Sequence, residues 1–346
     1  MRGPVAALTI CLLAAMAMKA QEAQGPTAPK AQKSYQEGLE WARHRMYPAA
    51  IDAMKKANKQ DGGQCDACAT KIIEYGIESD DFKAADAAAQ QLIADAKSPK
   101  EAAVAHLERG TVQYREAMDR KKNDCYAEAD REFQATLAAY PNVPSACFYD
   151  GIALAHLNRD TDAKAAFAKF LTIAPKDAVE RARAQRFLEN IDLARARMAP
   201  PFSVTTLEGR QVSLDSLAGK VVLIDFWATW CGPCREALPK IRDIAQKFSA
   251  EPLVVLSVSL DKDDGAWREF VAKNKMTWLQ YRDASGEMAR LFGVVEIPNT
   301  FTIDADGVLQ EEHVGSDADF QGKMKKLIAH ARELEEAPQV AMKPGA

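Results

Sequence analysis

Two features that many chains carry are missing from this sequence. Its 45 Lys and Arg residues are scattered, and no basic cluster alternates with aromatic residues, which account for only 8% of the chain. Nucleic acid is therefore not an expected partner. After residue 18, no apolar run approaches the roughly 20 residues that a membrane-spanning helix needs. The formal net charge of −4 likewise gives no sign of an anionic partner.

The chain start reads as an export signal. Arg2 precedes an apolar stretch over residues 5–18, and the small residues at 15–17 and Ala20 offer cleavage positions. We therefore expect residues 1–20 to be a signal peptide and the mature protein to be exported, to the periplasm where the cell has one. An uncleaved N-terminal membrane anchor is the alternative.

Cysteine usage agrees with export. Seven cysteines are present, and removal of Cys11 with the signal leaves an even number. An even number in an exported chain permits complete pairing, although the sequence does not reveal which cysteines pair.

The length of 346 residues and a hydrophobic content of 47% predict two domains. Residues 21–33 read as a linker. Residues 34–198 are Ala-rich with helical spacing and recurrent turn signals, which predicts an all-α domain of helical hairpins closed by a final helix over residues 177–198.

A repeat is visible within this helical region. Gly151, Ala163, Phe167 and Pro175 have spacings that resemble the tetratricopeptide pattern, in which a small residue lets two helices approach closely. Weaker copies contain Gly38, Ala50 and Met54, and Gly110, Ala129 and Phe133. Stacked hairpins would offer a concave surface to a peptide or protein ligand. A plain helical bundle is the alternative.

Residues 199–336 have a different pattern. Short β-rich apolar runs at 221–226 and 253–258 predict buried strands, and helical stretches follow at 235–248, 265–274 and 288–292. A β-hairpin is expected over residues 301–309 and an amphipathic helix over 317–336, which completes an α/β domain. Residues 337–346 read as a flexible tail.

Two cysteines stand where a predicted buried strand passes into a helix. Cys231 would begin the helix, where free backbone N–H groups and the helix dipole favour the thiolate, the attacking form of a cysteine. Cys234 lies one turn further on, close enough to resolve a mixed disulfide. Pro233 has no N–H, but none is needed in a first helical turn.

The segment Trp230-Cys231-Gly232-Pro233-Cys234 is the pentapeptide of the thioredoxin active site. Together with Pro201-Phe202, Gly219-Lys220 and Leu238-Pro239, it resembles the exported thioredoxin-like proteins of the TlpA/ResA type. The resemblance implies a thioredoxin fold, disulfide-bonded protein substrates, a membrane electron donor and no cofactor. In that family a Gly-Pro pair between the cysteines is associated with reductases, some of which act in cytochrome c maturation.

Further site residues follow from the same resemblance. Asp225, inside the apolar strand, matches an acidic position of thioredoxins, and a buried carboxyl there would have a raised pKa and could accept the Cys234 proton. A structural carboxylate is the alternative. Ile297-Pro298 resembles the cis-proline loop that faces the cysteines and pairs with substrate, and Trp230, Gly232 and Pro233 complete the expected substrate surface.

Other chemistries at this motif find little support. A zinc site would need two more ligands nearby, and the histidines of this domain, His313 and His330, lie in no ligand-like motif. No metal is expected. A peroxidase is disfavoured because Ala228, and not Thr, stands three positions before Cys231.

The remaining four cysteines are candidates for structural disulfides. Cys65 and Cys68 have the spacing of a redox pair but lack the preceding strand and Trp, so a structural disulfide is favoured over a second redox pair. Cys125 and Cys147 are expected to bridge successive hairpins and stiffen the repeats.

Three functions compete at this point. The favoured one is a reductase of exported proteins. An oxidase or isomerase would use the same residues and differ only in redox potential. A protein-binding scaffold with an accessory thioredoxin domain is the third.

Overall fold

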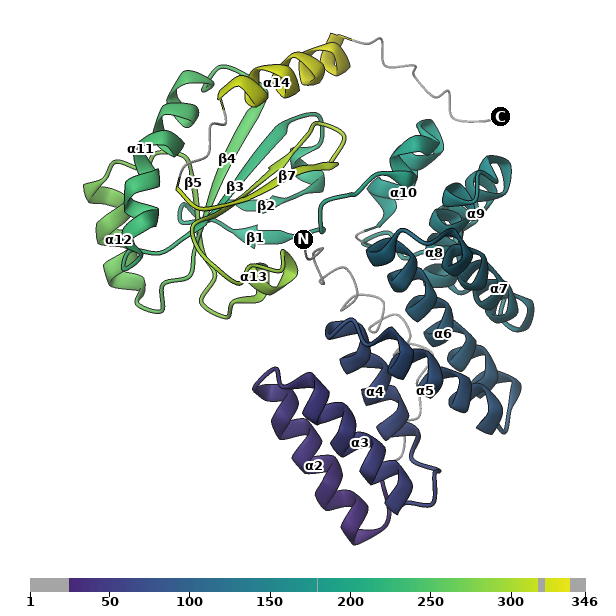
Figure 1. Ribbon diagram of the computed structural model, residues 1–346. Coiled ribbons are helices and arrows are strands. Elements are labelled where there is room, and N and C mark those ends of the chain that lie inside the picture. Colours follow the sequence, from purple (N-terminus) through teal and green to yellow (C-terminus); the bar gives the residue numbers. More distant parts are fainter. Residues whose placement is uncertain (1–24, 179, 317–320, 337–346) are drawn as a thin grey trace. The chain divides into compact units, whose positions relative to one another are not determined.

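The computed structural model describes residues 25–178, 180–316 and 321–336, and the expected signal peptide and C-terminal tail lie outside these ranges. The chain divides between Arg195 and Ala196 into two compact units, an N-terminal helical unit and a C-terminal α/β unit. Each unit is described by itself (Figure 1).

The helical unit is a series of helices joined by short turns, in which each helix packs against the next. Its described helices are α2 (Pro29–Arg43), α3 (Tyr47–Gln60), α4 (Asp66–Glu78), α5 (Phe82–Asp95), α6 (Pro99–Arg120), α7 (Asn123–Ala139), α8 (Pro144–His156), α9 (Asp160–Ile173) and α10 (Arg181–Glu189), followed by the 3-10 helix η2 (Ile191–Arg195). The predicted all-α domain of hairpins is confirmed.

Close helix contacts occur where the repeat pattern places glycine. A Cβ atom at Gly151 on α8 would lie 2.7 Å from the Phe167 ring on α9, and one at Gly110 on α6 would lie 2.7 Å from the Phe133 ring on α7. Only glycine permits this approach without displacement of the aromatic ring. The spacing of small and aromatic residues thus sets the packing of each hairpin, while assignment to the tetratricopeptide class stays a prediction.

The first helix begins earlier than the sequence predicts. α2 starts at Pro29, inside the segment expected to be a linker, because proline fits the first turn of a helix. The backbone N–H groups of Thr27 and Ala28 both donate to the Asp61 carboxylate at the end of α3, at 2.8 Å each. This carboxylate therefore ties residues 27–28 to the first hairpin.

The single closing helix expected over residues 177–198 is wrong. α10 ends at Glu189, and Asn190 has an extended backbone. The Asn190 side-chain oxygen accepts the backbone N–H of Asp192 at 3.1 Å, an alternative to helical bonding that Asn offers readily. The chain then continues as η2.

The C-terminal unit contains a five-stranded mixed sheet with helices on both faces and a separate two-stranded hairpin (Figure 1). Its strands are β1 (Ser203–Thr205), β2 (Gln211–Ser213), β3 (Val221–Trp227), β4 (Leu253–Ser259), β5 (Leu279–Arg282), β6 (Asn299–Ile303) and β7 (Leu309–Val314). Its helices are η3 (Asp215–Leu217), α11 (Gly232–Lys247), α12 (Asp264–Lys273), α13 (Glu287–Leu291) and α14 (Gln321–Glu336). In the five-stranded sheet the strand order is β5-β4-β3-β6-β7. β3, β4 and β5 are parallel to one another, β6 is antiparallel to β3, and β7 is antiparallel to β6. β1 and β2 form a separate antiparallel hairpin.

The central strand β3 is buried along its whole length, as its apolar sequence predicts. Successive side chains of a strand point to opposite faces. Accordingly Val222, Ile224 and Phe226 pack with β1, β2 and α13, whereas Val221 and Leu223 pack with α11 and α14. This sandwiching fixes β3 and hence the position where the chain leaves it.

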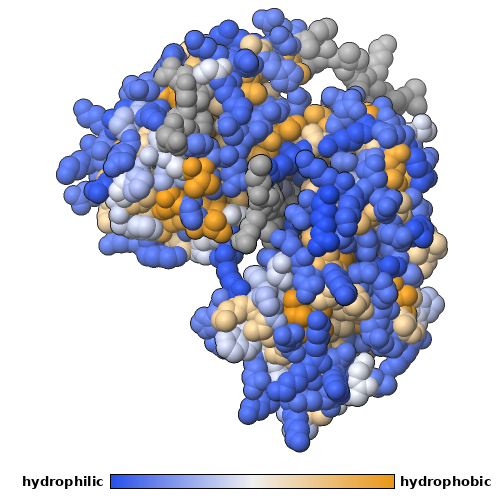
Figure 2. Space-filling model, viewed as in Figure 1, coloured by the Kyte–Doolittle hydropathy of each residue, from blue (hydrophilic) through white to orange (hydrophobic). Residues whose placement is uncertain are grey.

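The visible surface is mainly hydrophilic, with a few hydrophobic patches (Figure 2). Among the residues that the structure describes, no helix is both long and apolar enough to span a membrane.

Candidate active site

The two cysteines of the motif lie at the N-terminus of α11, as predicted. Cys231 is the N-cap, and its sulfur accepts the backbone N–H of Cys234 at 3.2 Å. The two sulfurs form a disulfide. On reduction, the same N–H group and the helix dipole would stabilise negative charge on Cys231.

The loop between β3 and α11 is held by Asp261, a residue that the sequence analysis missed. Thr229 donates to this carboxylate from its backbone at 3.0 Å and from its hydroxyl at 2.7 Å. Ser259 donates a further hydrogen bond at 2.6 Å. Asp261 follows the neighbouring parallel strand β4, and the carboxyl ends of parallel strands meet at one edge of a sheet. Its position after the second predicted strand was the available signal.

The loop before β6 approaches the cysteines from another segment. The Ile297–Pro298 bond is cis, as the resemblance implied. The Ile297 carbonyl oxygen lies 3.8 Å from the Cys231 sulfur, and the Pro298 carbonyl accepts the backbone N–H of Gly315 at 2.9 Å. Residues 66 positions apart are thereby brought together at the disulfide.

Two tryptophans close to the cysteines in sequence have opposite environments. Trp227 is buried in a cluster with both cysteines, whereas Trp230 is 68% exposed. Gly232 has open space around it. Val295, in the loop before Ile297, is 77% exposed and was not singled out from the sequence. An exposed valine in a loop carries no sequence signal of its own.

Asp225 is buried within β3, as predicted. Its carboxylate accepts one hydrogen bond, from the Ser257 hydroxyl on β4 at 3.1 Å. Burial raises the pKa of Asp225 to about 7, and the hydrogen bond from Ser257 opposes that rise. Asp225 is therefore poised to gain or lose a proton near neutral pH.

Comparisons with known proteins agree with this geometry. A sequence profile of the AhpC/TSA family matches residues 196–312. The thiol-disulfide oxidoreductase ResA of Bacillus thuringiensis (strain Al Hakam) is 31% identical over 131 residues, which are 37% of this chain and 76% of the relative. The chain belongs to the ResA-type thiol-disulfide oxidoreductases.

Other relatives match a similar share of this chain. ResA of Bacillus thuringiensis subsp. konkukian (strain 97-27) is 35% identical over 114 residues, 33% of this chain and 66% of that relative. A crystal structure of a thiol:disulfide interchange protein of the thioredoxin family from Chlorobium tepidum TLS is 26% identical, with a TM-score of 0.36, and covers 39% of this chain and 97% of that one. The helical unit lies outside the residues that the AhpC/TSA profile matches.

In this ResA-type protein, the remaining cysteines divide into a bridge and two free thiols. Cys65 and Cys68 form a disulfide at the start of α4, where the preceding element is the helix α3 and not a buried strand, so a structural role stays favoured over redox exchange. The predicted Cys125–Cys147 bridge is wrong, because both thiols are free. Burial raises the pKa of each.

Helix geometry explains the missing bridge. Cys125 lies near the start of α7, and Cys147 lies near the start of α8, the next helix in the chain. Across the short turn these helices run antiparallel, so their starts are about 20 Å apart at 1.5 Å per residue. A disulfide requires Cα atoms within about 7 Å.

No group of three or more His, Cys, Asp or Glu side chains in the described ranges has the arrangement of a metal site. The described residues of the site include the cysteine pair, the buried carboxylates of Asp225 and Asp261 and the exposed Trp230.

Asp225→Asn is expected to stabilise the C-terminal unit at high pH. The pKa of Asp225 is raised in the folded protein from 3.8 to about 7, so the folded state retains a proton that the unfolded state releases between these values. Stability should fall as pH rises through this window and stay low above it. Removal of the buried charge should raise the free energy of unfolding near pH 8 by up to roughly 4 kcal/mol, and by little near pH 4.

Chemical denaturation of both proteins at these two pH values measures the difference. Asp243→Asn, on the exposed face of α11, is the matched control. Equal stabilisation by Asp225→Asn at both pH values would contradict a proton shift at this carboxyl.

Proposed function

We propose that this protein is a disulfide reductase of exported proteins, with Cys231 as the nucleophile and Cys234 as the resolving thiol. The observation that carries this proposal is the Cys231 sulfur at the α11 N-terminus, where it accepts the Cys234 N–H beside the exposed Trp230. The Gly-Pro pair between the cysteines favours reduction over oxidation or isomerisation, which would use the same residues.

The reaction begins with the reduced pair. The Cys231 thiolate attacks one sulfur of a substrate disulfide, a new S–S bond forms, and the other substrate sulfur leaves as a thiolate. Asp225 then accepts the Cys234 proton, and the Cys234 thiolate attacks the Cys231 sulfur. The Cys231–Cys234 disulfide forms and the second substrate sulfur leaves, so two electrons have passed from the protein to the substrate.

The apolar surface around the cysteines would receive the substrate. Trp230 and Val295 are exposed, a Cβ atom at Gly232 would meet no other atom within 4 Å, and Cys231 itself is 6% exposed. A substrate strand would cross these residues and donate a backbone N–H to the Ile297 carbonyl, next to Pro298. Such a contact recognises the backbone of the substrate and not its side chains, so it suits substrates of varied sequence.

The proposal also covers the location of the protein and the source of its electrons. The apolar segment near the chain start supports export, and a membrane partner would return electrons to the oxidised pair after each cycle. Proteins of cytochrome c maturation are among the substrates that the resemblance suggests.

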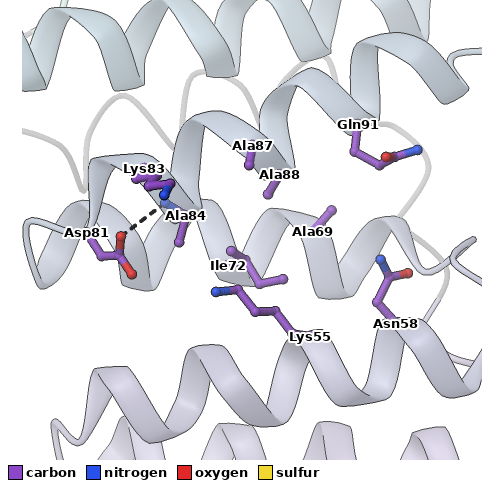
Figure 3. Close-up of a pocket in the computed structure, with 10 residues that line it drawn as sticks. All are labelled: Lys55, Asn58, Ala69, Ile72, Asp81, Lys83, Ala84, Ala87, Ala88 and Gln91. Atoms are coloured by element: carbon purple, nitrogen blue, oxygen red, sulfur yellow. Dashed lines mark hydrogen bonds between the residues drawn. The ribbon is translucent and has the colours of Figure 1, made fainter.

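The helical unit is proposed to hold a partner in a groove of about 460 Å³ between α3, α4 and α5 (Figure 3). Its lining includes the buried Ala69, Ile72 and Ala88 and the exposed Lys55 and Lys83. Within the described ranges neither lysine forms an ion pair, whereas Asp81 caps α5 through the N–H of Ala84 at 3.1 Å. An apolar peptide that carries carboxylates fits this combination of charge and surface.

Insulin reduction with a dithiol as electron source tests the catalytic proposal. Cys231→Ser should lose activity by at least about 100-fold, since the nucleophile is absent. Cys234→Ser should instead accumulate a mixed disulfide at Cys231, which mass spectrometry of the non-reduced protein detects. Cys125→Ser, which removes a free thiol outside the site, should match the parent. Equal activity in Cys231→Ser and the parent would favour the scaffold alternative.

Fluorescence polarisation tests the groove with two labelled Leu-rich peptides, one containing Asp and the other Lys. Lys55→Glu combined with Lys83→Glu should weaken binding of the acidic peptide by about tenfold or more, because two attractions become repulsions. Lys164→Glu, an exposed position on α9, is the control. Equal binding of both peptides to the parent would contradict the proposed ligand chemistry.

A further inference from the structure

Asp225 stands at the end of a short chain of hydrogen bonds. The Ser257 hydroxyl donates to one Asp225 oxygen at 3.1 Å. The Trp278 indole N–H donates to the same Ser257 oxygen at 2.8 Å. The three residues come from β3, from β4 and from the segment immediately before β5, so the chain forms only when the sheet is assembled.

The chemistry of these groups fixes the direction of the chain. An indole N–H donates and does not accept, and a serine hydroxyl has one proton. With Trp278 bonded to a lone pair of the Ser257 oxygen, the Ser257 proton is directed to Asp225. Ser257 is 0% exposed, so water does not compete for these positions.

The surroundings of Asp225 make this bond important. On the other side of β3, Thr300 of β6 pairs with Asp225, but its hydroxyl donates to the His313 carbonyl at 3.4 Å. Burial and the Ser257 bond are the two influences on the Asp225 carboxyl, and neither brings a cation. Burial alone favours the neutral acid, which cannot accept a proton.

The Trp278 end of this hydrogen-bond chain packs against the hydrophobic cluster that contains Cys231 and Cys234. Trp227 is two residues beyond Asp225 on β3 and therefore on the same face. It packs with Cys231 and Cys234, and Trp278 packs against both this cluster and the one beneath α11 and α14. The cysteine pair, which yields two thiols on reduction, thus belongs to the same cluster as Trp227 and Trp278.

We propose that Trp278 and Ser257 are positioning residues that form a neutral hydrogen-bond relay and stabilise the ionised Asp225 carboxylate, the form that accepts the Cys234 proton. The inference rests on the role proposed above for Asp225. It adds the two residues that allow a buried carboxylate without a cationic neighbour to act as a base. It also explains why a serine and a tryptophan from separate segments meet at this position.

The test measures the titration of Asp225 directly. Carbon-13 NMR of the carboxyl in the oxidised full-length protein gives its midpoint without any need for activity. Ser257→Ala removes the donor and should raise the midpoint by about one to two pH units, the usual effect of a hydrogen bond to a charged group. Trp278→Phe retains the ring and should raise the midpoint by less, because the Ser257 hydroxyl becomes free to turn away.

Two further variants serve as controls. Ser257→Thr keeps the hydroxyl and should restore the parent midpoint. Thr302→Val removes a buried hydroxyl of β6 that has no hydrogen-bond partner among the residues that the structure describes, and should leave the midpoint unchanged. An unchanged midpoint in both Ser257→Ala and Trp278→Phe would overturn the relay, as would an equal rise in Thr302→Val.

A second measurement separates this inference from the proposal on which it rests. The pH dependence of the resolving step is followed as release of a peptide trapped on Cys231. In Ser257→Ala this profile should move to higher pH together with the Asp225 midpoint. If Asp225→Asn leaves the parent profile unchanged, the role of Asp225 as base is wrong. If Asp225→Asn abolishes the pH dependence while Ser257→Ala does not move it, the relay alone is wrong.

Discussion

The chemistry of this protein depends on the place where β3 ends and α11 begins. Because β3 is buried on both faces, the end of the strand is fixed, and the first helical N–H groups are fixed with it. Cys231 occupies that position as the N-cap, so its sulfur meets a backbone donor that no side-chain motion can withdraw. The cis-proline loop and the Asp261 loop contacts are arranged around the same point. Disruption of β3 would therefore displace every other component of the site.

Two buried carboxylates support this junction in different ways. Asp261 accepts hydrogen bonds from Thr229 and Ser259 and so holds the loop before Cys231 in place. Asp225 accepts one hydrogen bond and retains a strong tendency to bind a proton. Asp225 has one donor, Ser257, to oppose the effect of burial, which favours the neutral acid. Asp261 thus has a structural role in the active-site region, and Asp225 has a proposed role as proton acceptor.

Much of this could be predicted from the sequence, because the deciding signals are local. The apolar run before Cys231, the Gly-Pro pair and the spacing of Gly151 and Phe167 each determine contacts within one strand, one helix turn or one hairpin. Most of what failed or was missed depends on distant segments. Asp261, Ser257 and Trp278 acquire their roles only through strand pairing, and the Cys125–Cys147 bridge was ruled out by helix direction, which spacing alone does not convey. Asn190 ended a helix through its own side chain, a competition that periodicity does not register.

The most direct test of the account is the ultraviolet absorbance of thiolate during a pH titration of the reduced protein in which Cys65 and Cys68 have both been replaced by Ser, because the Cys65 sulfur also caps a helix, α4. The α11 N-terminus should make Cys231 the first thiol to ionise, ahead of Cys125 and Cys147, whose pKa values are raised by burial. The account predicts that Cys231→Ser removes the thiolate that appears at lowest pH, while Cys125→Ser does not. It would be contradicted if the earliest thiolate signal persisted in Cys231→Ser.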